Sequence, residues 1–334
     1  MKILVTGSKG YLGSVLCEHL RNRGYNVVEI DNFHYRRKYE RLPYITPNNI
    51  ENSNGNFCIK MDVRYISENL IRRLNPDCVV HLAALVGEPL CKKLPRLTRS
   101  VNALATYKLA QFCKNLGIHL IFMSTCSNYG TTTEIVDEDS PLNPLGIYAK
   151  TKVEAEDYVR ENGGTIFRCA TMFGPSPRQR LDILLNEWTY QALKTRKIEL
   201  YEPQGWRPLI HVKDTTKAIE LAIEKRPQDT FNIGTFNVTK IMLAETIKSE
   251  FEKLKLPPVE ISIKEEAVDR RSYRVSFEKA RSELGFDSTR FASTGCYGHP
   301  ISELAEGVCE MVRHIQQIPD PDSPIYRNAE GFRK

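Results

Sequence analysis

The chain has no long hydrophobic run and no dense run of charge of one sign. Its 334 residues carry 47 Lys and Arg against 41 Asp and Glu, a formal net charge of +6. No apolar stretch approaches the roughly 20 residues that a membrane-spanning helix needs. The densest basic cluster, Arg36-Arg37-Lys38, is far shorter than the basic surface typical of a nucleic-acid-binding protein. The sequence therefore predicts no membrane insertion and no nucleic-acid partner.

Paired cysteines and clustered metal ligands are also absent. The nine cysteines include no C-x-x-C pair, which excludes a zinc ribbon and a thioredoxin-type redox motif. The seven histidines lack metal-ligand spacing, so no metal is expected. The odd number of cysteines favours a reducing compartment. The first apolar run ends at Thr6-Gly7, too early for a signal peptide, and we expect a cytoplasmic protein.

Short apolar runs alternate with helical patterns in the first half of the chain. Strands are predicted at 2–6, 26–30, 57–61, 78–82, 119–124 and 165–170, and helices at 11–23, 66–74, 98–115 and 147–161. This alternation is typical of an α/β protein whose parallel sheet carries helices on both faces. The fold class is therefore a Rossmann-type, doubly wound parallel sheet. From about Phe173 the pattern becomes irregular, which predicts a smaller mixed α/β lobe.

Three glycines, Gly7, Gly10 and Gly13, lie between the first predicted strand and the first predicted helix. Glycines at this place permit a tight turn, a close backbone approach to a pyrophosphate and close helix–strand packing. Asp31 follows the second strand, where a carboxylate would bind the adenosine ribose hydroxyls and repel a 2′-phosphate. The pattern predicts NAD rather than NADP. The arginines at 36 and 37 are the counter-evidence, because an arginine there could accommodate that phosphate.

Tyr148 and Lys152 stand four residues apart at the start of a predicted helix, so their side chains share one face. A tyrosine with its ordinary pKa near 10 is a poor base at neutral pH. The lysine charge favours the tyrosinate and should lower the tyrosine pKa. The hydroxyl-rich stretch 124–130 follows the fifth strand, at the sheet edge where such folds bind ligands. We therefore predict that this pair is catalytic.

Taken together, these features resemble the extended short-chain dehydrogenase/reductases, in the NAD-dependent sugar-nucleotide epimerase/dehydratase family. Two stretches, 83–91 and 170–186, are similar to a subgroup that includes GDP-heptose C4 dehydrogenases. The motifs are specific for the family but not for a substrate. They cover nearly the whole chain: 6–13, 31–32, 62–63, 81–84, Asn102, 124–130, 148–152, 168–175 and 207–212.

The resemblance implies a mechanism in which Tyr148 removes a proton from a sugar hydroxyl, usually at C4, while hydride passes to the nicotinamide. Lys152 would bind the nicotinamide ribose, and Thr125 would hydrogen-bond the same sugar hydroxyl. Asn102 would support the cofactor site. Asp62 would either accept from the adenine amino group or cap a helix. The implied cofactor-binding set is Gly7, Gly10, Tyr11, Leu12, Gly13, Asp31, Asn32, Asp62, Val63, Leu82, Ala83, Ala84, Tyr148 and Lys152.

The resemblance also implies a diphosphate site that uses arginines. The family's dehydratases carry an Asp-Glu pair where this chain has Cys126 and Ser127, and related decarboxylases keep a glutamate at the second place. Both reactions are therefore disfavoured. Cys126 would either line the pocket or shuttle protons as a thiol, and His211 is expected to be structural. The substrate-binding set is Cys126, Ser127, Arg178, Arg180, Asn186, Arg207 and Arg271.

The sequence thus predicts an NAD-dependent enzyme that oxidises C4 of a nucleotide-diphosphate sugar, with net C4 epimerisation. The alternatives are a net 4-dehydrogenase or 4-keto reductase, for example of a GDP-sugar, and a non-catalytic NAD-binding sensor. A homodimer or higher homo-oligomer is implied by the family. We assign residues 1–172 and 209–240 to the NAD-binding domain and 173–208 and 241–318 to the substrate lobe. The tail, 319–334, is expected to be extended or disordered.

Overall fold

The computed structural model describes residues 1–35, 44–45, 57–265, 271–288 and 300–332. Arg36, Arg37 and Cys296 lie outside the described residues. The eight described cysteines are all free thiols. No helix in the described part of the chain is long and apolar enough to cross a membrane.

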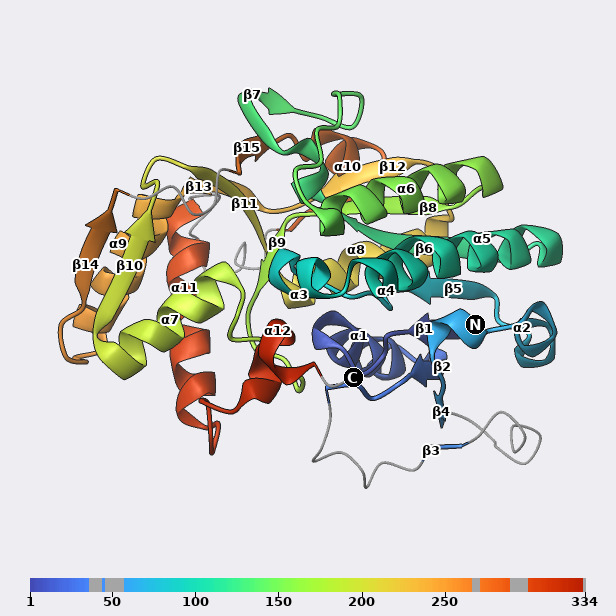
Figure 1. The fold of residues 1–334 in the computed structure, drawn as a ribbon, viewed down its shortest axis with the longest axis horizontal. Coiled ribbons are helices and arrows are strands. Elements are labelled where there is room, and N and C mark those ends of the chain that lie inside the picture. Colours follow the sequence, from blue (N-terminus) through green and yellow to red (C-terminus); the bar gives the residue numbers. More distant parts are fainter. Residues whose placement is uncertain (36–43, 46–56, 266–270, 289–299, 333–334) are drawn as a thin grey trace.

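The first lobe is built on a sheet of eight parallel strands (Figure 1), in the order β12-β8-β6-β5-β1-β2-β4-β3. The order reverses on either side of β1, which pairs with both β2 and β5, and such sheets bind ligands in the crevice beyond the strand ends at this point. The strands are β1 (Lys2–Thr6), β2 (Asn26–Asp31), β3 (Tyr44–Ile45), β4 (Phe57–Lys60), β5 (Cys78–His81), β6 (His119–Thr125), β8 (Thr165–Cys169) and β12 (Thr230–Ile233).

Helices cover both faces of this sheet because successive strand residues point to opposite sides. In β1, Ile3 and Val5 pack with α1 (Tyr11–Asn22) and α8 (Val212–Lys225), whereas Leu4 faces α2 (Glu68–Leu74), α5 (Ala105–Leu116) and α6 (Ile147–Asn162). The predicted α/β, doubly wound fold is confirmed. Short helices connect β5 to α5: α3 (Glu88–Lys93), α4 (Pro95–Arg99) and η3 (Ser100–Leu104).

A second apolar core lies at one end of the molecule, where α7, α9, α11, β10 and β14 gather (Figure 1). A three-stranded sheet, β13-β11-β9, and the pair β15-β7 lie outside the main sheet. After β11, the chain returns to the first lobe through α8 and β12. The elements are β7 (Thr131–Val136), β9 (Thr171–Phe173), α7 (Leu184–Thr195), β10 (Lys197–Tyr201), β11 (Trp206–His211), β13 (Phe236–Thr239), α9 (Lys240–Lys253), β14 (Glu260–Lys264), β15 (Ser272–Val275), α10 (Glu278–Ser282) and α11 (Pro300–Gln316).

The tail differs from the expectation of an extended or disordered segment. It forms the short helices η6 (Pro324–Tyr326) and α12 (Asn328–Gly331), which lie between the two lobes (Figure 1). The carbonyl of Tyr326 accepts a hydrogen bond of 2.8 Å from the Leu181 backbone N–H. Phe332 packs beside Tyr35 and against an apolar cluster around α3. These contacts with distant parts of the chain order a segment whose local composition is polar and proline-rich.

Candidate functional site

A cavity of about 580 Å³ lies at the carboxyl edge of the main sheet and reaches the second lobe. We call it the central cavity. It brings together the glycine loop, the ends of β2, β5 and β6, and the first turn of α6. The predicted site residues in its lining are Gly7, Gly10, Tyr11, Leu12, Gly13, Asp31, Asn32, Asp62, Val63, Leu82, Ala83, Ala84, Thr125, Tyr148, Lys152, Arg178, Arg180, Arg207 and Arg271.

The glycine loop leaves no room for a side chain at Gly7 or Gly13. A Cβ on Gly7 would stand 2.7 Å from the Ala83 backbone nitrogen, and Gly7 has a φ of +69°. A Cβ on Gly13 would stand 2.2 Å from the Gly7 carbonyl oxygen. No side chain caps α1 at Gly10, so its first N–H groups are suited to an anion. This cradle fits the pyrophosphate of NAD.

Two carboxylates lie at the end of the central cavity formed by β2 and β4, where the sequence predicts the adenosine. Asp31 accepts hydrogen bonds from the backbone N–H groups of Lys9 (2.9 Å) and Phe33 (2.7 Å), which hold it at the end of β2. Asp62 caps η2 (Val63–Tyr65) and pairs with Arg64 at 2.9 Å. Burial acts to raise the pKa of Asp62, but the hydrogen bonds from Arg64 outweigh it and hold that pKa below its ordinary value. The capping alternative for Asp62 thus has direct geometric support.

Tyr148 and Lys152 lie on one face of the first turns of α6, as predicted from their spacing. Lys152 is buried, with its Nζ 4.0 Å from the centre of the Phe122 ring, and burial lowers its pKa to about 7. Burial also raises the pKa of Tyr148 above its ordinary value, while the Arg180 charge acts in the opposite direction. The predicted lowering of the Tyr148 pKa is therefore wrong for this structure, because desolvation of the phenol exceeds the effect of the Arg180 charge.

The residues at the end of β6 and directly after it turn in different directions. Thr125 lines the central cavity, and its hydroxyl accepts a hydrogen bond of 3.2 Å from the Ser127 backbone N–H. Cys126 is turned away: its thiol donates to the Arg168 carbonyl at 3.1 Å, and burial raises its pKa well above the ordinary value. Ser127 lies off the lining as well, with its Oγ 3.4 Å from the Tyr273 hydroxyl. The prediction that Cys126 lines the pocket is wrong, because η4 (Cys126–Tyr129) directs its side chain into the apolar contact with β15.

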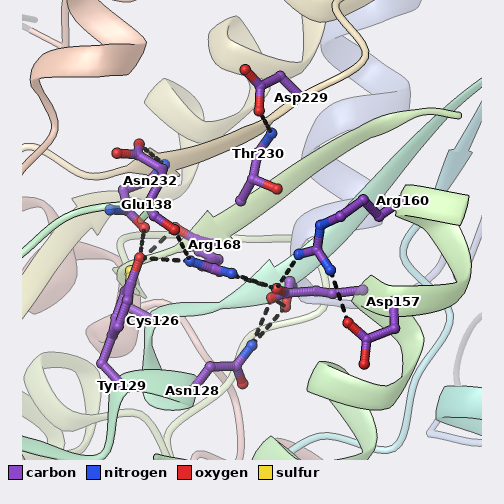
Figure 2. Close-up of polar contacts among 12 residues, drawn as sticks. Cys126, Asn128, Tyr129, Glu138, Asp157, Arg160, Arg168, Asp229, Thr230 and Asn232 are labelled. Carbon is purple, nitrogen blue, oxygen red and sulfur yellow. Dashed lines mark hydrogen bonds and ion pairs between the residues drawn. The ribbon is translucent and has the colours of Figure 1, made fainter. Parts of the chain in front are cut away.

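Behind the cavity wall, a buried polar network joins α6 to the sheet (Figure 2). The Nε and Nη2 of Arg168 donate to Oε2 of Glu156 at 3.0 and 2.9 Å. Oε1 of Glu156 accepts from Asn128 at 2.6 Å and from the Ser124 hydroxyl. Arg168 also donates to the Tyr129 hydroxyl at 3.0 Å. Several residues that carry the family resemblance thus bond α6 to the sheet.

Four predicted substrate residues of the second lobe are arginines in the lining of the central cavity. Arg207 is buried in the cavity wall and donates to the Arg271 carbonyl, while the Arg271 guanidinium reaches Ser127 Oγ at 3.5 Å. Arg178 donates to Asn328 at 2.8 Å. Arg180 pairs with Asp182 at 2.8 Å.

Asn186, the fifth predicted substrate residue of the second lobe, lies outside the lining of the central cavity. It accepts from the Gly174 N–H at 3.2 Å and donates to the Tyr11 hydroxyl at 3.2 Å. Its amide is thereby occupied in joining the two lobes, which corrects the prediction of a diphosphate contact. His211 is structural as predicted, because it caps α8 and pairs with Glu310 at 2.8 Å.

Asn102 also takes the supporting position expected of it, since its side chain bonds both backbone groups of Leu85 at 2.8 and 3.0 Å. Sequence reasoning missed a larger part of the cavity lining, including Glu88, Asn328 and Phe332. Glu88 carries one usable signal, an acidic residue followed by proline where a helix begins after a predicted strand. Asn328 and Phe332 carry none, since their neighbours in space are remote in sequence.

Comparisons with known proteins identify the family of this chain. Residues 3–234 match the NAD dependent epimerase/dehydratase family. The chain is 28% identical to UDP-glucose 4-epimerase of Bacillus subtilis (strain 168), with 89% of this chain and 95% of that protein covered. It is 28% identical to UDP-glucuronic acid decarboxylase 6 of Arabidopsis thaliana, with 86% of this chain and 84% of that protein covered.

A solved structure of an NAD-binding epimerase is also similar to this chain. UDP-glucuronic acid 4-epimerase from Bacillus cereus, in complex with UDP-glucuronic acid and NAD, is 25% identical with a TM-score of 0.76, and 95% of this chain and 99% of that chain are covered. The family match spans more than half of the chain and confirms the resemblance found in the sequence. The protein therefore belongs to the NAD-dependent epimerase/dehydratase family, and it is an NAD-dependent enzyme of the extended short-chain dehydrogenase/reductase type.

Proposed function

We propose that the protein oxidises C4 of a nucleotide-diphosphate sugar with NAD and that its net reaction is C4 epimerisation. One observation carries this proposal: Thr125, Tyr148 and Lys152 share the central cavity with the glycine cradle, and Arg207 and Arg271 lie in its wall. Cofactor site, proton-transfer groups and cations suited to a diphosphate therefore meet in one space. The relatives named for UDP-sugar epimerases and decarboxylases support the same substrate class.

In this mechanism, NAD would lie on the glycine cradle with its ribose hydroxyls toward Asp31, and it supplies the hydride acceptor. The Tyr148 hydroxyl, once deprotonated, takes the proton of the sugar C4 hydroxyl, and Thr125 orients that hydroxyl. Burial raises the Tyr148 pKa, so the phenolate needs a neighbouring cation: the Arg180 charge lowers this pKa, and Lys152 would add to that effect in its protonated form. Arg207 and Arg271 would hold the diphosphate, which leaves the sugar free to turn and accept hydride on its other face.

Cys126 and Ser127 argue against a dehydratase or a decarboxylase. Elimination of water needs an acid and a base at the far end of the sugar. The Cys126 thiol is fully buried, is bonded to a backbone carbonyl and has a raised pKa, so it is unsuited to shuttle protons. The Ser127 hydroxyl has no acid–base capacity near neutral pH.

The proposal is tested with purified protein and a panel of UDP-, GDP-, CDP- and dTDP-sugars, after mass spectrometry of any ligand released on denaturation. An epimeric product without net NADH is expected. A 4-keto product that forms with NADH would replace epimerisation by net dehydrogenation. Tyr148→Phe should abolish turnover while NAD binding persists, and full activity of that variant would overturn the mechanism.

We also propose a homodimer or higher homo-oligomer and a cytoplasmic location, the latter because the nine cysteines fit a reducing compartment. The dimer would pair α5 and α6 of two copies. Leu104 and Tyr107 support this surface, because they are large apolar residues that are 39% and 37% exposed, respectively. Both lie beside α6, where the Tyr107 ring contacts the Tyr158 ring. Light scattering should report a dimer that Leu104→Glu dissociates; an unchanged mass for that variant would contradict the surface.

A further inference from the structure

The N-terminus of the catalytic helix α6 is capped by a residue from a different element. Its own N-cap residue is Gly146, which has no side chain to offer. Instead, Oε1 of Glu88 accepts from the Ile147 N–H at 3.0 Å, and Oε2 accepts from the Tyr148 N–H at 3.1 Å. One carboxylate thus satisfies two of the N–H groups that every helix leaves unpaired at its start.

Gly146 and Glu88 fit one another closely. A Cβ on Gly146 would stand 2.1 Å from Oε2 and 2.3 Å from Cδ of Glu88. Gly146 has a φ of −119°, which any residue can adopt, so space for the carboxylate, and not backbone conformation, requires glycine there. Glu88 is itself fixed at the start of α3, after Gly87 with a φ of +97° and before Pro89.

This contact acts directly on the proposed base. Tyr148 is the second residue of α6, so the backbone amide that Glu88 holds belongs to the residue whose hydroxyl removes the proton. A carboxylate is favoured at a helix N-terminus by the helix dipole and by charge-assisted hydrogen bonds. Without it, the first turn would lose two hydrogen bonds, and a displacement of about 1 Å at a reacting group costs about 10²-fold in rate.

We propose that Glu88 is a positioning residue, whose carboxylate fixes the first turn of α6 and thereby places Tyr148 for proton transfer. This inference rests on the proposed function for its kinetic consequence. The cap itself is independent of that function and is measurable without turnover.

The test compares Glu88→Ala, Glu88→Gln and Gly146→Ala with Ser67→Ala as the matched control. Ser67 caps α2 with a 3.2 Å hydrogen bond from the Leu70 N–H and lies outside the central cavity, so its loss removes a helix cap remote from the chemistry. Glu88→Ala should lower kcat about 10²-fold, with KM for the sugar nucleotide and Kd for NAD changed less than about threefold. Glu88→Gln keeps one acceptor and should restore about tenfold of that loss. Ser67→Ala should leave kcat unchanged.

Gly146→Ala displaces the same carboxylate from the other side. It should match Glu88→Ala, and the double variant should be no worse than either single one, since both changes remove one contact. Hydrogen exchange at the start of α6 should accelerate in all three Glu88 and Gly146 variants and stay unchanged in Ser67→Ala.

The outcomes separate the two claims. Full kcat in Glu88→Ala, while Tyr148→Phe is inactive, overturns the positioning role and leaves the proposed function standing. Full activity of Tyr148→Phe overturns the proposed function. Unchanged exchange at the start of α6 in Glu88→Ala overturns the cap, even for a preparation that turns over none of the sugars tried. A raised KM with unchanged kcat would instead make Glu88 a substrate contact and would also overturn the inference.

Discussion

Replacing Arg168 by methionine should destabilise the first lobe strongly. Glu156 has no exposed side-chain surface, and Arg168 supplies both of its close cationic hydrogen bonds. Removing one partner of a buried ion pair typically costs about 3–5 kcal/mol, because the other charge is left uncompensated. Arg160, whose Nη2 lies 3.7 Å from Glu156, offsets part of this loss. We therefore expect about 3 kcal/mol for Arg168→Met.

The assay is native-state hydrogen exchange of the β6 and β8 amides, which reports the opening free energy of this lobe without requiring both lobes to unfold together. Adding Glu156→Leu removes the unpaired buried carboxylate and should recover about 1–2 kcal/mol. Replacing both partners of a buried ion pair by apolar residues typically destabilises a protein less than replacing one partner alone. A loss below about 1 kcal/mol in Arg168→Met would refute this reasoning. So would a double variant whose loss equals the sum of the two single losses.

Three further predictions concern single positions in the central cavity. Burial lowers the Lys152 pKa from 10.5 to about 7, so between these pH values the unfolded chain binds a proton that the folded chain does not, and the free energy of unfolding rises with pH. Lys152→Met should reduce this slope, measured by urea unfolding, by up to about 1.4 kcal/mol per pH unit. Equal slopes for the two proteins would contradict the prediction. Gly13→Ala places a Cβ 2.2 Å from a backbone oxygen and should weaken NAD binding at least tenfold by calorimetric titration; wild-type affinity would sink the cradle assignment. Asn328→Ala removes an acceptor from the buried Arg178 and should cost about 1–3 kcal/mol in urea unfolding; no change would show that the tail adds nothing to stability.

Local patterns predicted the strand–helix alternation because each apolar run is buried on both faces of a parallel sheet. The glycine loop and the shared face of Tyr148 and Lys152 could be predicted for a similar reason, since both depend on residues only a few positions apart. The short strands β7, β9 and β13 were missed because their pairing partners lie far away in the sequence.

The errors at the site have a common physical cause. A sequence does not reveal which way a side chain turns after a strand end, as at Cys126, or which face of a helix packs inward, as at Asn186 in α7, and both side chains are bonded outside the cavity lining. The Tyr148 pKa depends on the depth of burial, which only the packed fold decides. Asn328 reaches Arg178 and Asp182 across about 150 residues of intervening chain, beyond any local signal.

The position of α12 links the ordering of the tail to the contents of the central cavity. Asn328 donates to the Val86 carbonyl of the first lobe at 3.2 Å and, through its backbone N–H, to Asp182 of the second lobe at 2.8 Å. A ligand that binds only when this bridge is formed must stabilise the bridge by its own binding free energy. For such a ligand, protease sensitivity at residues 319–332 would report cavity occupancy and would rank unlabelled candidate sugars without any need to observe turnover.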